Sequence, residues 1–446
     1  MINIADVRAQ YCELIDADRE NNRKGAQALV DNMERSDLYF RGRFTSKTLQ
    51  IPRLYSKKMI DQFKEIVRIS HGIFVKVIEE YRKCADYRAL FDFPKEAEEL
   101  ICLSTGYDAL LPIARFDIFY HEDTGKFWFC EINTDGSSGM NEDRLQDAFI
   151  LHNPAHQEMR RRFRMRPMEL FDSWVETFLK LYDSFENRVP EPNVAIVDFM
   201  DGGTVREFEE FARHFQKAGV NCEICDIRDL SYRDGKLYSP SGHVVDAIYR
   251  RAVTTDILSS MDAVRPFIDA VRDKAVFLAG SFCTQVIHHK RLFYALHLPR
   301  THQFLTKEEI EFVKAHVPWT APFTKEHIDP EKVKADKDRY ILKPEDSYAS
   351  QGVYAGVEHD QEEWEKLVSG SFENGYICQE YCPQHSAENI DFVFGDGQWH
   401  SYIDMAGLYA YNGEFAGVFS RAALGSGIIA SHRNERTQAT YIVEEK

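Results

Sequence analysis

Residues Arg115-Phe-Asp117-Ile-Phe-Tyr-His-Glu-Asp-Thr-Gly-Lys-Phe-Trp-Phe-Cys-Glu131-Ile-Asn133 decide the fold class of this chain. Two segments with alternating apolar residues flank Asp123-Thr-Gly125, which predicts a hairpin with a three-residue turn that ends in glycine. In this register Asp117 lies opposite Glu131, and Arg115 lies opposite Asn133. Because side chains alternate along a strand with a period of two, all four point to the same face of the sheet.

This polar face predicts a metal site. Directly opposed Cβ atoms lie about 4.5–5.5 Å apart, so Asp117 and Glu131 repel each other unless a cation lies between them. Carboxylate and amide oxygens are the hard ligands that Mg²⁺ takes, and we expect Asp117, Glu131 and Asn133 to hold it. The alternative is an exposed hairpin with ordinary surface charges. A two-residue turn would place Asp117 opposite Ile132 and separate the cluster.

The composition is that of an ordinary globular protein. The 446 residues are too many for a single core, and 44% hydrophobic with 28% charged residues is a typical balance. The net charge of −17 argues against nucleic acid or an anionic membrane as the main partner. No apolar run approaches the roughly 20 residues of a membrane helix, and the first residues lack the pattern of a signal peptide. We expect a cytoplasmic protein.

The nine cysteines are an odd number without a repeating spacing, which suits a reducing compartment. Cys222 and Cys225 form a CxxC motif, and Cys378 and Cys382 lie four residues apart. Structural zinc needs four ligands in a closed geometry. Because the first pair lies in an apparent strand and the second flanks an apparent nucleotide hinge, zinc is the less favoured interpretation.

Changes in the apolar pattern predict five regions. Residues 1–95 have helical spacing and form a helical N-terminal region, and residues 96–150 change to strand character and contain the hairpin. Residues 151–189 are expected to be a helical connector, 190–285 a small α/β domain, and 286–446 the nucleotide-binding lobes. The connector contains a basic run, Arg160 to Arg166, which we interpret as a solvated helix face that pairs with acids; phosphate binding is the alternative.

The small α/β domain is predicted from alternating strands and helices. Apparent strands at 194–198, 220–225 and 244–249, with an amphipathic helix at 204–218, predict a parallel sheet with short connections. The turn after the first strand contains Gly202-Gly203 but no GxGxxG motif, so dinucleotide binding has little support.

Two lysines and a polar loop predict a nucleotide site in the last third of the chain. Lys290 lies in an apparent helix, and Lys343 ends a strand that Pro344 terminates. The loop that follows, with Ser347, Ser350 and Gly352, can turn backbone N–H groups towards phosphates. The strand at 376–383 ends in a polar hinge that can offer main-chain groups to an adenine edge. Each piece alone is also compatible with an ordinary surface.

Together these residues resemble an ATP-grasp enzyme, a fold that holds ATP between two α+β lobes. In most members the metal residues follow the hinge, whereas here they precede it. This order is similar to that of the circularly permuted glutathionylspermidine-synthase-like group, in which an Arg-x-Asp … Glu-x-Asn hairpin comes first and a small α/β domain follows. The resemblance covers roughly residues 96–446 and implies a mixed α+β and α/β fold, with a small parallel pre-ATP-grasp domain. Residues 1–90 are too few to hold the amidase domain of the bifunctional members.

The resemblance implies an ADP-forming C–N ligase with ATP and Mg²⁺ as cofactors and Arg115 as the catalytic residue. Such an enzyme converts a carboxylate into an acyl phosphate, from which an amine displaces phosphate. The implied ATP-binding residues are Lys290, Lys343, Ser347, Ser350, Gln351, Gly352, Gln379, Glu380 and Tyr381. The candidate substrate-binding residues are Asp135, Ser137, Ser138, Arg250 and Arg421, and a structural ion pair is an equal alternative for the two arginines.

The expected partners are a small-molecule carboxylate and an amine, with peptides and polyamines among the candidates, and neither nucleic acid nor membrane. Two other functions stay open at this point. One is a small-molecule kinase on the same fold, because the nucleotide site alone does not name the acceptor. The other is a non-catalytic nucleotide-binding module.

Overall fold

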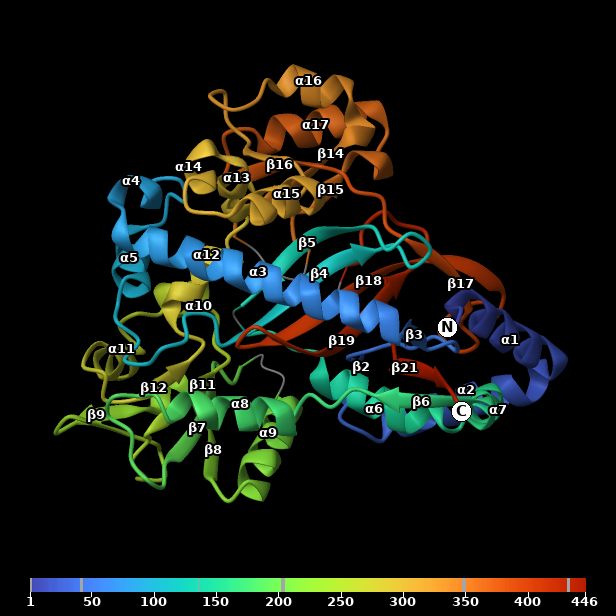
Figure 1. Cartoon of the computed structure of the whole chain (residues 1–446), viewed down its shortest axis with the longest axis horizontal. Coiled ribbons are helices and arrows are strands. Elements are labelled where there is room, and N and C mark those ends of the chain that lie inside the picture. Colours follow the sequence, from blue (N-terminus) through green and yellow to red (C-terminus); the bar gives the residue numbers. More distant parts are fainter. Residues whose placement is uncertain (1, 41–42, 135, 202–204, 347–349, 431–433) are drawn as a thin grey trace.

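A six-stranded antiparallel sheet lies at the centre of the molecule (Figure 1). Its order is β20-β19-β18-β4-β5, and β17 pairs with β18 beyond the end of β4. The strands are β4 Ile113–Tyr120, β5 Phe127–Asn133, β17 Ser386–Ile390, β18 Trp399–Tyr411, β19 Glu414–Ala423 and β20 Glu435–Gln438. The predicted hairpin is thus β4–β5, and β18 joins it to strands from the end of the chain. This computed structural model describes residues 2–40, 43–134, 136–201, 205–346, 350–430 and 434–446.

A long helix, α3 (Lys57–Lys83), covers one face of this sheet (Figure 1). Ser56 caps its start, and its buried side chains recur every three or four residues, as the sequence predicts for an amphipathic helix. Phe63 meets Tyr120 edge-on at 4.8 Å between ring centroids, and Phe74 meets Phe116 at 5.3 Å. Through these contacts α3 packs on the face of β4 that is opposite to its polar residues.

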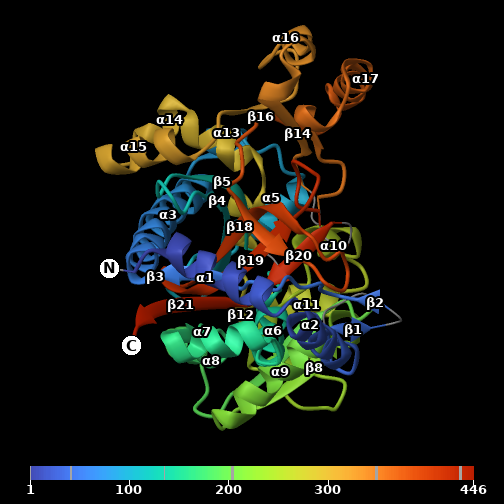
Figure 2. The same ribbon diagram turned by 90° about the vertical axis from the view of Figure 1, so that its right-hand side faces the viewer.

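A second sheet lies above the first in Figures 1 and 2 and forms the upper lobe. Its antiparallel order is β13-β16-β14-β15, with β13 Thr320–Pro322, β14 Tyr340–Pro344, β15 Tyr354–Ala355 and β16 Tyr376–Glu380. Trp364 and Val368 of α17 (Gln361–Ser371) pack on Leu342 and Cys378 of this sheet. The other helices of this part are α12 Gln285–His288, α13 Arg291–His297, α14 Pro299–His302, α15 Lys307–His316 and α16 Pro330–Ala335.

The small α/β domain lies below the central sheet in Figure 1. Its parallel sheet has the order β12-β11-β7-β8, which confirms the predicted parallel pairing. The strands are β7 Asn193–Asp198, β8 Asn221–Asp226, β11 Ala247–Arg250 and β12 Phe277–Ala279, with a side hairpin of β9 Ser231–Arg233 and β10 Lys236–Tyr238. The helices are α8 Asp172–Tyr182, α9 Val205–Lys217, α10 Thr254–Ser259 and α11 Arg265–Arg272.

A third sheet joins the two ends of the chain. β21 (Thr440–Glu445) pairs in parallel with β3 (Arg53–Ser56) and antiparallel with β6 (Phe163–Pro167). The region therefore contains strands as well as the expected helices. Its helices are α1 Ile4–Ala17, α2 Arg19–Glu34, α6 Met140–Ile150 and α7 Pro154–Arg162, and the remaining short elements are β1 Tyr39–Phe40, β2 Arg43–Phe44, α4 Ala85–Arg88 and α5 Lys95–Ile101.

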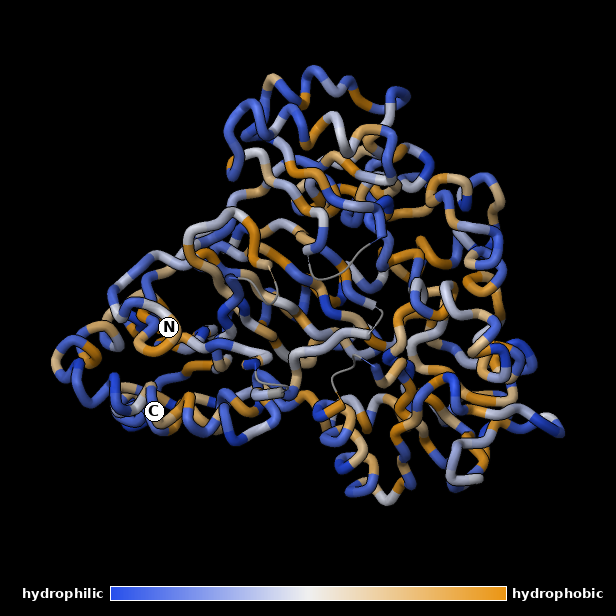
Figure 3. The backbone as a smooth tube through the Cα atoms, turned by 180° about the vertical axis from the view of Figure 1, so that it is seen from behind, coloured by the Kyte–Doolittle hydropathy of each residue, from blue (hydrophilic) through white to orange (hydrophobic). Residues whose placement is uncertain are grey.

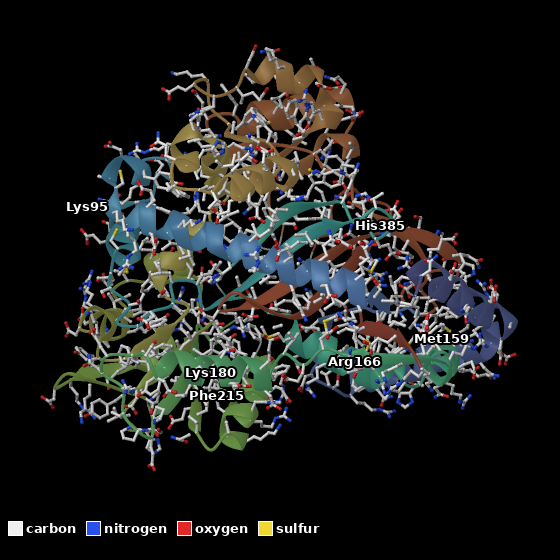
Figure 4. All side chains as sticks on the ribbon, viewed as in Figure 1. Lys95, Met159, Arg166, Lys180, Phe215 and His385 are labelled. Carbon is white, nitrogen blue, oxygen red and sulfur yellow. The ribbon has the colours of Figure 1, made fainter. Side chains whose placement is uncertain are left out.

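The basic run is only partly the helix face that the sequence analysis expects. α7 ends at Arg162, and Arg164 and Arg166 are exposed on the edge strand β6 while Met165 between them is buried. Exposed and buried side chains therefore alternate as they do in a strand, but the run of arginines makes this alternation hard to see in the sequence. Arg166, labelled in Figure 4, pairs with Glu444 at 3.2 Å, as expected for a solvated basic segment.

The hydropathy of the backbone follows this architecture (Figure 3), with apolar segments in the strands and the inner helix faces and polar segments in the outer loops. The described part of the chain has no helix that is both long enough and apolar enough to cross a bilayer. All nine cysteines are free thiols, including Cys222 and Cys225.

Candidate active site

The polar face of the β4–β5 hairpin is assembled as the sequence predicts. Asp117 is paired with Glu131, and Arg115 is paired with Asn133. The four side chains approach one another on one side of the sheet, where they form hydrogen bonds among themselves. The local pattern of this stretch therefore gives the correct neighbours.

The structure reaches this register by a different route. The turn has four residues, Glu122–Gly125, and is closed by the N–H of His121, which donates to the carbonyl of Lys126 at 2.8 Å. A turn of this length alone would place Asp117 opposite Cys130. A β-bulge at Cys130 shifts the ladder by one residue and restores the pairing. The predicted three-residue turn is wrong, whereas the predicted register at the site is confirmed.

Asp117 is fully buried and is held by two guanidinium groups. Arg115 donates from Nε and Nη2 to the two carboxylate oxygens at 2.7 and 3.0 Å, and Arg421 of β19 donates to Oδ2. Burial raises the pKa of the Asp117 carboxyl, and the two arginines oppose that shift. Arg421, a substrate-binding candidate in the sequence, therefore lies in the predicted metal cluster.

Asn133 and Glu131 complete this cluster. The amide nitrogen of Asn133 donates to Asp117 Oδ2 at 3.0 Å and to Glu131 Oε1 at 3.3 Å, so a single atom lies between the two carboxylates. Burial alone would raise the pKa of Glu131, but the positive charges of Arg421 and Lys290 outweigh it and hold the pKa at about 2. Glu131 is therefore ionised at neutral pH.

Gly407 leaves space for this cluster, because it has no side chain. It lies on β18 directly opposite Asp117. A Cβ atom there would come within 2.7 Å of Asp117 Oδ1 and 2.8 Å of Arg115 Cδ. The absent side chain lets Arg115 fold back onto Asp117. The sequence alone does not identify this residue, because a glycine in a strand indicates a close approach without showing which group approaches.

A cavity opens beside the cluster, between the central sheet and the upper lobe. It holds about 720 Å³ of space that is not filled by atoms, part of it open to solvent. Eight residues that the sequence analysis singles out line it: Glu131, Lys290, Lys343, Ser350, Gln379, Glu380, Tyr381 and Arg421. Segments far apart in the sequence thus meet at one site.

The walls of the cavity are mainly apolar. Phe119 and Phe129 come from the hairpin, Met405 from β18, Ile341 from β14, and Ile429 from the segment between β19 and β20. An apolar slot with polar groups at one end suits a flat heterocycle that carries charged groups. The alternation of the hairpin strands could have identified Phe119, but not Phe129, which the bulge at Cys130 pairs with Ile118, and nothing local identifies the other three.

Lys343 is fixed by the hairpin bulge and by the hinge strand. Its ammonium donates to the carbonyl of Cys130 at 3.1 Å and to Oε1 of Gln379 at 2.8 Å. Gln379 in turn donates to Thr320 Oγ1 at 2.9 Å. The bulge therefore sets both the register of the acidic pair and the position of this lysine. Burial lowers the pKa of the second lysine, Lys290, although the charge of Glu131 opposes that shift.

The segment Gly427–Ile429 covers the cavity from the side of the central sheet. The carbonyl of Gly427 accepts hydrogen bonds from Tyr381 at 3.3 Å and from Gln384 at 2.8 Å. Ser350 of the polar loop donates to the carbonyl of Ile429 at 3.3 Å. The hinge and the polar loop are therefore tied to the same covering segment.

Several predicted residues do not line the cavity. Gln351 is exposed, and Gly352 packs against Pro344 with a positive φ of 70°. Ser137 donates to the carbonyl of Asn133 at 3.0 Å. Asp135 and Ser347 lie outside the described residues.

Ser138 and Arg250 have structural contacts. The carbonyl of Ser138 accepts a hydrogen bond from Arg115 Nη1 at 2.6 Å. Arg250 is buried in the small α/β domain, where its guanidinium donates to the carbonyls of Gly280 and Ala252.

The donor set fits a hard divalent cation such as Mg²⁺. One amide nitrogen already lies between two carboxylate oxygens, and a half-turn of the Asn133 amide would present its oxygen at the same point. Asp117, Glu131 and Asn133 would then supply three oxygen ligands, and Mg²⁺ takes its remaining ligands from water and phosphate.

Solved structures match this fold, although no protein-family model and no curated sequence match the chain at a significant level. A glutathione synthetase-like effector from Globodera pallida in its apo form has a TM-score of 0.59 at 12% identity, over 94% of this chain and 96% of that chain. The two chains share a fold. A protein of Methylobacillus flagellatus, provisionally named a gamma-glutamylcysteine synthetase, matches at 11% identity with a TM-score of 0.45, over 87% and 89%.

Proposed function

We propose that the chain is an ADP-forming ligase of the ATP-grasp type, which joins a carboxylate to an amine. The observation that carries the proposal is the meeting of Glu131, Lys290 and Lys343, from three separate segments, at one cavity. The order in the chain, with the acidic hairpin first and the lysines and hinge later, is that of the circularly permuted group. The fold shared with a glutathione synthetase-like protein supports the same assignment.

The charges around the cavity support a polyphosphate ligand. Lys290, Lys343 and Arg421 line it together with the carboxylates of Glu131 and Glu380, and each of these cations is at least nine-tenths buried. Buried cations are costly to desolvate, and an anionic ligand in the cavity would offset part of that cost. The apolar slot beside the hinge would take the adenine, with main-chain groups at Glu380 and Tyr381 along its edge.

The hairpin residues would hold Mg²⁺ at the phosphate end. Asp117, Glu131 and Asn133 are the ligands that the geometry offers. When bound, the ion would neutralise charge on the β- and γ-phosphates.

The remaining residues would bind and orient the reacting groups. Arg115 presents a planar fork, two of whose donors rest on Asp117, and it would orient the γ-phosphate and the acyl phosphate. Lys290 and Lys343 would hold the α- and β-phosphates. The covering segment at Gly427–Ile429 would exclude water, which otherwise hydrolyses an acyl phosphate. The amine would then attack the acyl carbon and displace phosphate.

A screen for phosphate release tests the proposal. The protein is incubated with ATP and Mg²⁺ against a matrix of small carboxylates and amines, peptides and polyamines included. We expect phosphate release only with a matched pair, and one amide per ADP. A stable phosphorylated product formed without an amine would instead identify a kinase, and the absence of turnover with every pair, alongside tight ATP binding, would identify a non-catalytic module.

A further inference from the structure

Glu207 belongs to α9 of the small α/β domain, but its carboxylate lies at the start of α6, outside that domain. Oε2 accepts hydrogen bonds from the N–H groups of Gly139, Met140 and Asn141 at 3.1, 2.9 and 3.1 Å. Oε1 accepts one from Arg251 at 2.7 Å, and both side chains of this pair are 2% exposed. One carboxylate thus joins α6, α9 and the end of β11.

This contact replaces a missing helix cap. The first N–H groups of a helix have no partners within it, and an anion there is favourable. The residue before α6 is Gly139, which has no side chain to accept these hydrogen bonds and adopts a φ of 110°. A Cβ atom at Gly139 would come within 2.8 Å of the Phe419 ring. The position can therefore take no capping side chain, and Glu207 supplies the cap from another domain.

The residue just before the capped segment forms a hydrogen bond with Arg115. The carbonyl of Ser138, one residue before Gly139, accepts hydrogen bonds from Arg115 Nη1 at 2.6 Å and from the Tyr409 hydroxyl at 2.7 Å. Asp117 fixes the other side of the guanidinium. The orientation of Arg115 therefore depends on where Ser138 lies, and Ser138 is held by the cap next to it.

We propose that Glu207 is a positioning residue, which orients Arg115 through the start of α6 and so couples the small α/β domain to the reacting atoms. The effect on the reaction rests on the function proposed above for Arg115. The path runs from Arg251 to Glu207, then through Gly139 and Ser138 to Arg115. Loss of the Glu207 charge loosens Ser138 and, with it, one of the two supports of the guanidinium.

The chain offers a control in Glu169, an exposed residue that caps a different helix. Its carboxylate accepts hydrogen bonds from the N–H groups of Phe171, Asp172 and Ser173 at 2.7, 2.7 and 2.8 Å, at the start of α8. It therefore caps a helix with three N–H groups, as Glu207 does. Its hydrogen bonds in the described structure stay within residues 169–173, so it has no path to Arg115.

The test compares Glu207→Gln with Glu169→Gln, each of which removes a charge at nearly constant size. The first readout is amide formed per ADP, because a poorly held acyl phosphate is lost to water. We expect this ratio to fall about tenfold in Glu207→Gln, since small misplacements of catalytic groups cost on the order of 10- to 100-fold. We expect the KM for ATP to stay near the wild-type value in both variants, because neither glutamate lines the cavity. Glu169→Gln keeps the wild-type ratio.

The second readout is solvent exchange of the Arg115 Nε–H in ¹⁵N NMR spectra, assigned with Arg115→Lys. We expect faster exchange in Glu207→Gln and unchanged exchange in Glu169→Gln. This readout does not need turnover, so it decides the inference even where the wild type joins no carboxylate to an amine. In that case only the proposed function fails.

Wild-type exchange and a wild-type ratio in a folded Glu207→Gln protein would overturn the inference and leave Glu207 as an ordinary structural cap. The same conclusion would follow if Glu207→Gln and Arg115→Lys lowered the ratio additively, because residues on one path are not additive. If Glu207→Gln does not fold, Glu207→Asp keeps the charge with a shorter reach, and the same two readouts decide.

Discussion

Two buried groups of charges lie at opposite ends of the β4–β5 hairpin, and they are composed differently. The turn cluster consists of Arg8, Arg53, Glu122, His385 and Asp404, and Figure 4 labels His385 within it. Glu122 pairs with Arg8 at 2.7 Å, and Arg53 pairs with Asp404 at 2.7 Å and with Glu122 at 3.3 Å. His385 lies 2.8 Å from Asp404. Each arginine of this cluster therefore pairs directly with a carboxylate.

The cavity cluster consists of the carboxylates Asp117 and Glu131 and the cations Arg115, Lys290, Lys343 and Arg421, with Glu435 3.8 Å from Arg421. Its Lys343 ammonium is held by neutral oxygens, the Cys130 carbonyl and the Gln379 amide. The turn cluster links α1, β3, the hairpin turn and β18, whereas the cavity cluster adjoins empty space. A buried cation that is held only by neutral oxygens carries a desolvation cost that an anionic ligand can offset. The environment of Lys343 and the adjoining cavity therefore separate the candidate active site from the structural cluster.

The surrounding cations determine what removal of either acid does to the protein without ligand. Arg115 and Arg421 act on Asp117, and Arg421 and Lys290 act on Glu131, so loss of either acid removes counter-charge from buried cations. We expect Glu131→Ala to lower the free energy of unfolding.

The largest effect is expected from the acids of the cavity cluster. Glu131→Ala and Asp117→Ala should each reduce ADP formation by roughly 1000-fold or more, because they remove metal ligands and charge at the phosphate end. The measurement is steady-state ADP release, with circular dichroism to show that the fold persists. Glu122→Gln in the turn cluster is the matched control and should keep most of the activity. Near-normal turnover in Glu131→Ala would refute the assignment of the cavity cluster.

The turn cluster should respond in stability instead. Glu122→Gln leaves Arg8 and Arg53 without their shared carboxylate, and breaking a buried ion pair in this way costs about 3–5 kcal/mol. Urea unfolding measures the loss. ATP affinity should stay at the wild-type value, and a variant that unfolded normally but no longer bound ATP would show that the two clusters are not separate.

Replacement of either cavity lysine should weaken ATP binding, whereas replacement of Glu122 in the turn cluster should lower stability. Lys290→Met and Lys343→Met each remove a charge-assisted contact and should weaken ATP binding by about 1.5–3 kcal/mol in calorimetry. Because burial lowers the pKa of Lys290, its charged form destabilises the fold, so Lys290→Met should raise the unfolding free energy of the protein without ligand. Lys76→Met, at a partly exposed pair with Glu309, is the control and should change neither quantity appreciably. Unchanged ATP affinity in both cavity variants would make these lysines structural.

The smallest expected effect is the pH dependence of the stability that the turn cluster provides. Burial raises the pKa of Glu122, but Arg53 and Arg8 outweigh it, and the folded pKa is lowered from the usual 4.5. The stabilisation from this carboxylate is therefore complete above about pH 4.5 and is lost as the pH falls through the lowered pKa. The difference in unfolding free energy between wild type and Glu122→Gln should be constant near neutral pH and shrink below 4.5. A difference that stays constant into strong acid would contradict the ion-pair explanation.

The local sequence pattern predicts those contacts of the cavity cluster that lie within the hairpin. The alternation along β4 and β5 brings Asp117 and Glu131 together, although the assumed turn is one residue too short. The missing residue is compensated by the bulge at Cys130, whose carbonyl binds Lys343. That contact joins residues far apart in the chain, so no local pattern reveals it.

Long-range packing explains the other differences. Gly407 and Arg421 reach the cluster through β18 and β19, and their pairing with β4 depends on the whole sheet. Arg250 is a candidate for anion contact in the sequence, and its hydrogen bonds to the carbonyls of Gly280 and Ala252 depend on the packing of the small α/β domain. The strand β6 is hidden because its exposed arginines give no apolar signal.

The yield of amide per ADP, wild type against Arg115→Lys, decides between the ligase and its alternatives. Arg115 holds Asp117 with two donors and Ser138 with a third, and lysine keeps the charge but not this planar geometry. We predict one amide per ADP in the wild type with a matched pair. In the variant we predict near-normal ATP binding, loss of most amide and residual ATP hydrolysis. A phosphorylated product that accumulates in the wild type without any amine would contradict the ligase assignment.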